Sequence, residues 1–383
     1  MNYCSLCNKS FEQVSDSKEH IIPQAIGGIK TVKGYICEEC NNRTGREWDS
    51  KLAKKLERLS SFFKIKRERG DIPPVIIKTT SGKEYIQSAN GRLSLTKPIY
   101  EEEIINEKQV SIKISARNKK EAIQQIKRAK KKYPKLDEQK LLKQVEEKGM
   151  SSSYSDELFE LQLECLIGDN FCQKSIVKTA LALAVNAGIS SDNCQYAKSY
   201  LQKQTSSYYC FGYFYEEDPI LNRPKGIPIH CVYVKGDPQN EIIFAYIELF
   251  GIYRGLVCLS DNYNGKKFEK HYAINPTEPI HTPLDLNISL EISKENLKKF
   301  IKESHINVEK LKLIFDDLIP PQLKKNEENE KNLVLDNAIS KGFKNCGASE
   351  GENLNREHLD KLTETVMEEI QAWIFNEIKK RKV

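Results

Sequence analysis

The residues best suited to chemistry lie near the start of the chain, where two pairs of cysteines each enclose two residues. Cys4 and Cys7 form the first pair, Cys37 and Cys40 form the second, and 29 residues separate the pairs. Four thiolates at this spacing can complete the tetrahedral shell of a structural zinc ion. We therefore expect Zn2+ at these four cysteines, with four ordinary buried thiols as the alternative.

A second group of polar side chains lies between the cysteine pairs and directly after them. Glu19 precedes His20, the only histidine in the first 229 residues, and Asn41 follows the last cysteine of the second pair. An imidazole titrates near neutral pH and suits a general base, while carboxylate and amide oxygens suit a hard divalent cation. A zinc ion that holds Cys40 would also aim Asn41.

These motifs, with Ile21-Ile22-Pro23 after the histidine and Gly27-Gly28 further on, resemble the zinc-knuckle branch of the HNH (ββα-metal) endonucleases. The resemblance covers roughly residues 1–60. It implies that His20 is the general base that takes a proton from the attacking water. It also implies that Glu19 and Asn41 hold one Mg2+ or Mn2+ ion, and that the cut leaves 5′-phosphate and 3′-hydroxyl ends.

The chain departs from the family pattern at two positions. Glu19 stands where the family usually has aspartate, and Val32 stands where its middle asparagine would fall. A further constraint is geometric, because neighbouring residues on a regular strand face opposite sides. Glu19 and His20 can share one site only if the strand breaks between them, and Pro23 with Gly27-Gly28 favours such a break.

A helix is expected to start near Asn41 and to carry a basic face. Residues 51–70 hold eight basic and two acidic residues. Its candidate phosphate contacts are Lys51, Lys54, Lys55 and Arg58. An apolar stripe at helical spacing should pack inward, formed by Trp48, Leu52, Leu56, Leu59 and Phe63. Contact with DNA phosphates is the functional interpretation, and a solvated helix face is the alternative.

A second basic helix is expected over residues 117–143, which hold eleven basic and three acidic residues. Its densest part contains the candidate nucleic-acid contacts Lys127, Arg128, Lys130 and Lys131. A solvated helix face is again the alternative. Further along, Lys178 lies in the most apolar predicted helix, residues 171–188, either as a buried functional amine or as a lysine that reaches the surface.

Composition favours a reduced, cytoplasmic protein. The 383 residues are 30% charged and carry a formal net charge of +6, which permits nucleic-acid binding without establishing it. No apolar run approaches the roughly 18 residues of a membrane span, and no signal peptide precedes Cys4. Seven of the eleven cysteines lie outside the two pairs without paired spacing, which is typical of free thiols.

The sequence predicts an α+β protein of three segments. Residues 1–70 would form the HNH domain, and residues 71–285 a regulatory or targeting domain with an antiparallel sheet packed on helix 171–188. Residues 286–383 would be charged helices, separated by a linker from Pro320-Pro321 to Lys331. The last helix has an apolar stripe, which offers a surface for a partner or for a homo-oligomer, or packs on its own domain.

These observations predict a metal-dependent endonuclease acting on DNA, most simply double-stranded. The architecture is similar to antiphage-defence effectors, in which the larger domain senses a signal ligand or binds an activating protein. Two alternatives remain open. One is a zinc-stabilised nucleic-acid-binding scaffold without cleavage activity, and the other is a sequence-specific restriction or homing-type HNH nuclease.

Overall fold

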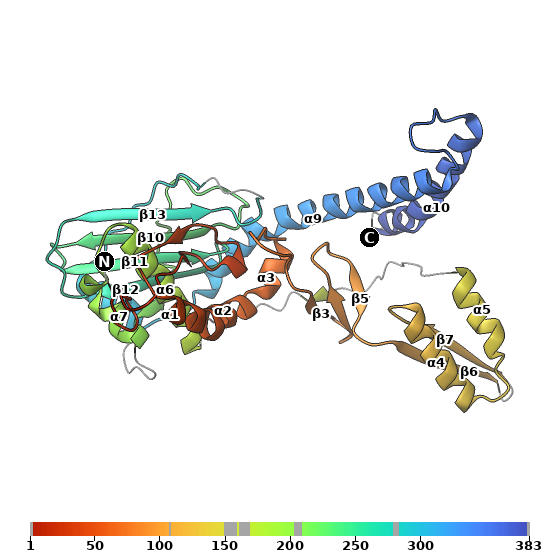
Figure 1. The fold of residues 1–383 in the computed structure, drawn as a ribbon, viewed down its shortest axis with the longest axis horizontal. Coiled ribbons are helices and arrows are strands. Elements are labelled where there is room, and N and C mark those ends of the chain that lie inside the picture. Colours follow the sequence, from red (N-terminus) through yellow and green to blue (C-terminus); the bar gives the residue numbers. More distant parts are fainter. Residues whose placement is uncertain are drawn as a thin grey trace. The chain divides into compact units, whose positions relative to one another are not determined.

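The computed structural model describes six stretches of the chain: residues 3–106, 109–148, 159–160, 169–202, 209–278 and 283–380. Their contacts divide the chain into two units (Figure 1). The first unit joins Met1–Pro73 with Gln162–Leu323, and the second joins Pro74–Leu161 with Lys324–Val383. The sequence-based boundaries near residues 70 and 285 group the chain differently, and independent folding of those three segments stays a prediction.

The first 73 residues form a small module of short strands and helices, called the N-terminal module below. In chain order its elements are β1 (Glu19–His20), η1 (Gln24–Ile26), β2 (Thr31–Val32), α1 (Glu38–Thr44), the π-helical turn η2 (Gly45–Asp49), α2 (Ser50–Lys55) and α3 (Glu57–Phe62). The helix expected near Asn41 is therefore present. Its predicted apolar stripe is confirmed, because all five of its side chains, from Trp48 to Phe63, are buried.

The rest of the first unit is built on a five-stranded antiparallel sheet with the order β13-β10-β11-β12-β9. Its strands are β9 (Phe211–Tyr213), β10 (His230–Asp237), β11 (Ile242–Leu249), β12 (Tyr253–Ser260) and β13 (Phe268–Ile274). Its helices are α6 (Asn170–Asn186), η3 (Ser191–Asn193), α7 (Gln195–Gln202) and α8 (Lys294–Lys302). The predicted antiparallel meander packed on an apolar helix, and the α+β class, are confirmed.

This sheet is covered on both faces. Every residue of β10, β11 and β12 is buried, as in sheets that have no solvated side. Side chains alternate along β10, so Val232 and Val234 face one side and Tyr233 the other. Tyr233 lies in an apolar cluster with Leu297 of α8. Lys270, which pairs with Val234, binds the carbonyl of Asn186 at the end of α6, so α6 lies on the opposite face from α8.

The N-terminal module docks on the α6 face of the sheet. His230 shares the alternation of Val232, and its Nε2 lies 2.9 Å from the carbonyl oxygen of Ile26. Tyr272, which pairs with Val232, accepts a hydrogen bond of 3.3 Å from the backbone N–H of Lys30. The module and α6 therefore share one face of the sheet, and the module is part of the first unit's core.

The second unit contains two small antiparallel sheets and charged helices. One sheet has the order β5-β4-β3-β8, with β3 (Val75–Thr79), β4 (Glu84–Gln87), β5 (Leu93–Leu95) and β8 (Phe159–Glu160). The other is the hairpin of β6 (Ile99–Asn106) and β7 (Gln109–Ser115). The helices are α4 (Lys119–Lys132), α5 (Glu138–Lys148), α10 (Arg356–Lys380) and the larger part of α9 (Val308–Asn345).

Two predicted helix boundaries are wrong. The basic helix expected over 117–143 is interrupted between α4 and α5, where Pro134 cannot continue a helix. Conversely, the linker expected from Pro320-Pro321 onward is helical, because α9 runs through both prolines. Prolines inside a helix cost about 3 kcal/mol or more. Tertiary contacts compensate here, since Asp317 accepts a hydrogen bond from Gly226 and Leu318 is buried just before the prolines.

Within the part of the chain that the structure describes, no helix has both the length and the apolar character of a membrane span.

Because His230 joins the sheet to the N-terminal module, the first unit should lose stability in mild acid. Nδ1 accepts a hydrogen bond from the backbone N–H of Phe250, so Nε2 carries the proton that faces Ile26. Burial lowers the pKa of His230 from 6.5 to about 4, although the Ile26 carbonyl and the Glu248 carboxylate oppose this. The unfolded chain therefore binds more protons between these values, and stability falls as the pH falls from 6.5 toward 4.

Comparison of wild type with His230→Gln, which does not titrate, isolates this effect. The stability advantage of wild type should shrink by about 2 kcal/mol between pH 7 and pH 5. Urea unfolding of both proteins at each pH measures it. Zinc loss in acid acts on both proteins alike, so an advantage that is independent of pH would contradict the assignment of a neutral His230.

Candidate active site and metal centre

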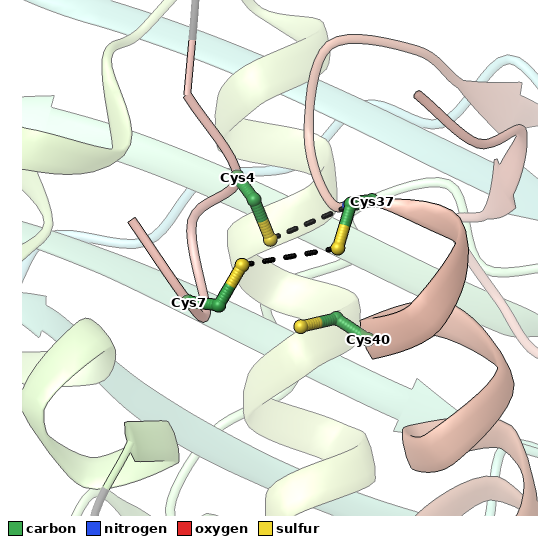
Figure 2. Close-up of side chains that lie close together, drawn as sticks. All are labelled: Cys4, Cys7, Cys37 and Cys40. Carbon is green, nitrogen blue, oxygen red and sulfur yellow. Dashed lines mark hydrogen bonds between the residues drawn. The ribbon is translucent and has the colours of Figure 1, made fainter. Parts of the chain in front are cut away.

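The four cysteines of the two pairs come together at one end of α1. Cys4 and Cys7 lie on the first loop, where Cys4 accepts a backbone hydrogen bond from Asn8. Asn8 adopts a positive φ of 58°, which closes this tight turn. Cys37 is the N-cap residue of α1, and Cys40 lies in its first turn. Figure 2 shows the four side chains facing one another.

Their geometry fits a zinc ion. The four Sγ atoms lie within 4.8 Å of one another, and those of Cys7 and Cys37 are 3.8 Å apart. Zn–S bonds of about 2.3 Å in a tetrahedron place sulfur atoms about 3.8 Å apart, whereas a disulfide needs about 2.05 Å. The backbone N–H of Cys37 also donates to Sγ of Cys4, which is typical of a thiolate in a knuckle (Figure 2). The cluster thus has the ligands and the spacing of a structural zinc site.

The loop between β1 and β2 depends on the two predicted glycines. Gly27 has a φ of +96°, which a side chain would strain. A Cβ atom on Gly28 would lie 1.8 Å from the carbonyl oxygen of Ile22, so no other residue fits there. The loop is thereby folded tightly back against the end of β1, where the predicted base His20 lies.

His20 is placed for contact with solvent or a ligand. It is the last residue of β1, and its side chain is 27% exposed. Its Nε2 lies 3.3 Å from Oε2 of Glu68, a residue of the segment after α3. This segment is held in place where the N–H of Lys66 donates to the carbonyl of Pro276, at 2.7 Å. A carboxylate that receives the Nε2 proton orients the ring and leaves the other nitrogen as the basic atom.

Glu19 is placed differently from His20. β1 is regular across both residues, and the chain bends only after His20. The strand break that would let the two side chains share a site is therefore absent between them, and they contact different parts of the structure. Glu19 is 4% exposed and points inward, where its Oε1 lies 2.6 Å from Nζ of Lys178.

Lys178 is the centre of a buried cluster that the sequence analysis did not predict. Its Nζ also lies 2.5 Å from Oδ2 of Asp49 and 3.4 Å from Oγ1 of Thr44. The other oxygen of Asp49 accepts a hydrogen bond of 2.6 Å from Ser175, one turn earlier on α6. With Glu19 these residues form what we call the Lys178 cluster. Its signal in the sequence is Lys178 itself, which lies within the most apolar of the predicted helices.

The ammonium of Lys178 is stabilised by two carboxylates, which repel each other. Burial alone would lower the pKa of Lys178, but the Asp49 and Glu19 carboxylates more than compensate, so its pKa is raised and the ammonium form persists. Burial raises the pKa of Glu19, and Lys178 opposes that shift. The sequence left two options for Lys178, a buried amine or a lysine that reaches the surface. In the structure Lys178 is buried and does not reach the surface.

Asn41, the remaining residue of the predicted site, lies in α1 directly after the zinc-type cysteines. Its Nδ2 donates a hydrogen bond of 3.2 Å to Oγ of Ser17, and that hydroxyl donates to the carbonyl of Ile36. Ser17 lies two residues before Glu19 on the chain, so Asn41 is directed toward the start of β1. The amide oxygen is the atom that a cation would require.

The residues present do not fit a divalent ion at Glu19 in this arrangement, because the ammonium of Lys178 already lies against that carboxylate. Among the described residues, the four cysteines are the only group of three or more His, Cys, Asp or Glu side chains whose ligand atoms converge. Glu19 and Asn41 as ligands of Mg2+ or Mn2+ therefore stay a prediction, and one that requires Lys178 to move.

The predicted basic contacts lie on two different units. On α2 and α3, Lys51 and Lys54 are exposed, and Lys54 pairs with Glu57 at 2.7 Å, while Lys55 and Arg58 are half-buried. On α4, the exposed residues are Lys127, Arg128 and Lys131. Lys130 instead donates to the backbone carbonyls of Pro134 and Leu136, in the segment after α4. None of these positions by itself identifies a nucleic-acid surface.

Comparison with known proteins gives one match. A family model described as HNH endonuclease matches residues 4–57. These residues include the four cysteines, β1, Asn41 and Asp49, whereas Glu68 and Lys178 lie outside them. Comparisons with curated proteins and with solved structures found no match. Residues 4–57 therefore carry an HNH endonuclease domain, which supports a nuclease-type hydrolase with a nucleic-acid substrate.

Proposed function

We propose that this chain is a metal-dependent endonuclease that hydrolyses phosphodiester bonds in DNA, with His20 as its general base. The observation that carries the proposal is the position of His20. It lies within the segment that matches HNH endonucleases, on β1 and beside the tight Gly27-Gly28 loop, with its ring partly open to solvent. An imidazole in this position can take a proton from a water molecule that attacks the phosphorus.

Each other part of the site has a proposed role. Zinc at the four cysteines is structural and holds the start of α1, and with it Asn41. Glu68 orients the ring of His20. HNH nucleases use divalent metals, and we propose Mg2+ or Mn2+ here. Binding of that ion by Glu19 and Asn41 is part of the proposal. It requires the Glu19 carboxylate to be released from Lys178 and β1 to change so that Glu19 and His20 face one site.

The substrate is proposed to be double-stranded DNA. Lys51, Lys54, Lys55 and Arg58, on the helices that follow the zinc-type cysteines, would contact phosphates near the cut. Lys127, Arg128 and Lys131 would add contacts from the second unit. Phosphate contacts carry no base sequence, so they support general rather than site-specific cleavage.

We also propose that the enzyme is regulated, as in a cytoplasmic antiphage effector. More than four fifths of the chain lies outside residues 4–57. The N-terminal module is docked on the sheet and on α6, which could transmit a signal or the binding of a partner to it. This part of the proposal is supported by architecture alone.

One observation favours a second function. The Glu19 carboxylate is buried against Lys178, as expected if the fold is kept as a zinc-stabilised scaffold that binds nucleic acid without cutting it. The scaffold needs zinc only, whereas the nuclease needs a second, exchangeable cation.

Cleavage of supercoiled plasmid at low salt tests the nuclease. Wild type with Mg2+ or Mn2+ should nick or linearise the plasmid, and omission of these ions should stop cleavage. His20→Ala should be about 10²–10⁴-fold slower, because the general base is lost. Discrete fragments would favour the restriction or homing-type alternative, and broad degradation an effector.

His305→Ala is the matched control, because His305 is exposed and lies outside the N-terminal module. All proteins are compared at equal zinc content. If His20→Ala cuts as fast as wild type, His20 is not the base. If wild type and every variant, including those described below, leave the plasmid intact, the scaffold is the better interpretation.

The zinc site makes a separate prediction. Wild type purified under reducing conditions should release one zinc per chain when its thiols are modified, measured with a colorimetric chelator. Cys40→Ser should carry none and should unfold at a lower temperature, because a structural zinc site contributes directly to folding. Cys346→Ser changes an equally buried thiol outside the cluster and should keep its zinc. Retention of zinc by Cys40→Ser would exclude the assignment.

A further inference from the structure

The Lys178 cluster lies at the boundary between the N-terminal module and α6. The three oxygen atoms around the ammonium, from Glu19, Asp49 and Thr44, all come from the module, and the cation comes from α6. The side chain of Lys178 is 1% exposed, so its charge is neutralised by protein groups alone.

We propose that Lys178 is an internal gate, a cation that occupies the Glu19 carboxylate and keeps a divalent metal ion off it until α6 releases the N-terminal module. The inference rests on the proposed function, because it concerns the metal that the nuclease would use. In this proposal α6, which lies outside the segment that matches HNH endonucleases, controls whether a metal ion binds to Glu19.

The distances make the two cations compete for one carboxylate. A Mg2+ ion binds carboxylate oxygen at about 2.1 Å, and Nζ lies 2.6 Å from Oε1 of Glu19. Two cations on this oxygen would therefore be within about 5 Å of each other, in a site closed to water. Their repulsion is screened little there, so the ammonium competes with a divalent ion for this carboxylate and weakens its binding.

The backbone of Lys178 is also held against the N-terminal module. Its backbone carbonyl accepts a hydrogen bond of 3.1 Å from the hydroxyl of Tyr35, a fully buried residue of the module. Ser175 holds Asp49 from the same face of α6. Because the side chain of Lys178 is only 1% exposed, the gate would open through a local separation of α6 and the module. Any ligand or partner that shifts α6 would then favour metal loading.

If Lys178 serves only as a structural tether, its removal is expected to have a different effect. Its removal would lower stability without creating a metal site. The gate predicts that its removal exposes a carboxylate that binds a divalent ion. Metal binding in the absence of DNA therefore separates the two roles.

The test uses full-length, zinc-loaded protein and Mn2+ titrated by calorimetry or by electron paramagnetic resonance. Lys178→Met leaves two buried carboxylates unpaired, so the main variant is Lys178→Met with Asp49→Asn, which keeps the formal charge of the cluster at that of wild type. This double variant should bind one Mn2+ at least about tenfold more tightly than wild type, within the usual range of coupling between sites. Addition of Glu19→Gln should abolish the gain. Equal Mn2+ affinity of wild type and the double variant overturns the gate.

A second measurement needs no variant and covers the case in which the double variant does not fold. An amine-reactive reagent with mass spectrometry reports the accessibility of Lys178 in wild type. The gate predicts that Lys178 is protected in zinc-loaded protein without Mn2+ and becomes labelled at Mn2+ concentrations that support plasmid cleavage. Continued protection at those concentrations overturns it, with the exposed Lys51 as an internal standard for the reagent.

Failure of the gate can be distinguished from failure of the nuclease. Cleavage by wild type that is lost in His20→Ala, with Mn2+ affinity unchanged by the double variant, removes the gate and keeps the nuclease. A gain of Mn2+ binding at Glu19 without cleavage by any variant supports Lys178 as the competing cation and removes the nuclease.

Discussion

A buried ammonium group must be surrounded by negative charge, and in this protein that requirement joins two distant parts of the chain. Lys178 comes from α6, while Glu19 and Asp49 come from the N-terminal module. Loss of one partner from such a group costs about 3–5 kcal/mol, because the remaining charge stays buried and unpaired. The N-terminal module, α6 and the sheet beneath them therefore depend on one another for their stability.

The small size of the N-terminal module explains why its stability relies on α6 and the sheet. A segment of about 70 residues rarely gains more than 3–5 kcal/mol from its own core. This module supplements its core in two ways. The four cysteines fit a zinc ion that fastens the first loop to α1, and α2 packs on α6. Phe63 stacks on Phe250, whose ring in turn contacts His230. The HNH domain is thus continuous with the core that surrounds it.

Because side chains alternate along a strand, the two neighbouring residues of β1 face opposite sides. His20 turns toward the partly open side, where Glu68 is its partner, and Glu19 turns toward the interior, where Lys178 is its partner. Both partners lie outside the segment that matches HNH endonucleases. In the proposed enzyme, access of substrate to the base and access of metal to the acid would therefore be governed by different elements, the segment after α3 and helix α6.

The sequence by itself determined the features that depend on nearby residues. Cysteine spacing specified the zinc-type cluster, and helical spacing specified the buried stripe from Trp48 to Phe63. Only the tertiary structure decided what faces Glu19. Lys178 is 129 residues from Asp49 along the chain, and no local pattern records their approach. Likewise, α9 continues through two prolines because distant residues pack against that turn. Local spacing constrains a few turns of backbone, whereas the pairing of buried charges depends on how the whole unit packs.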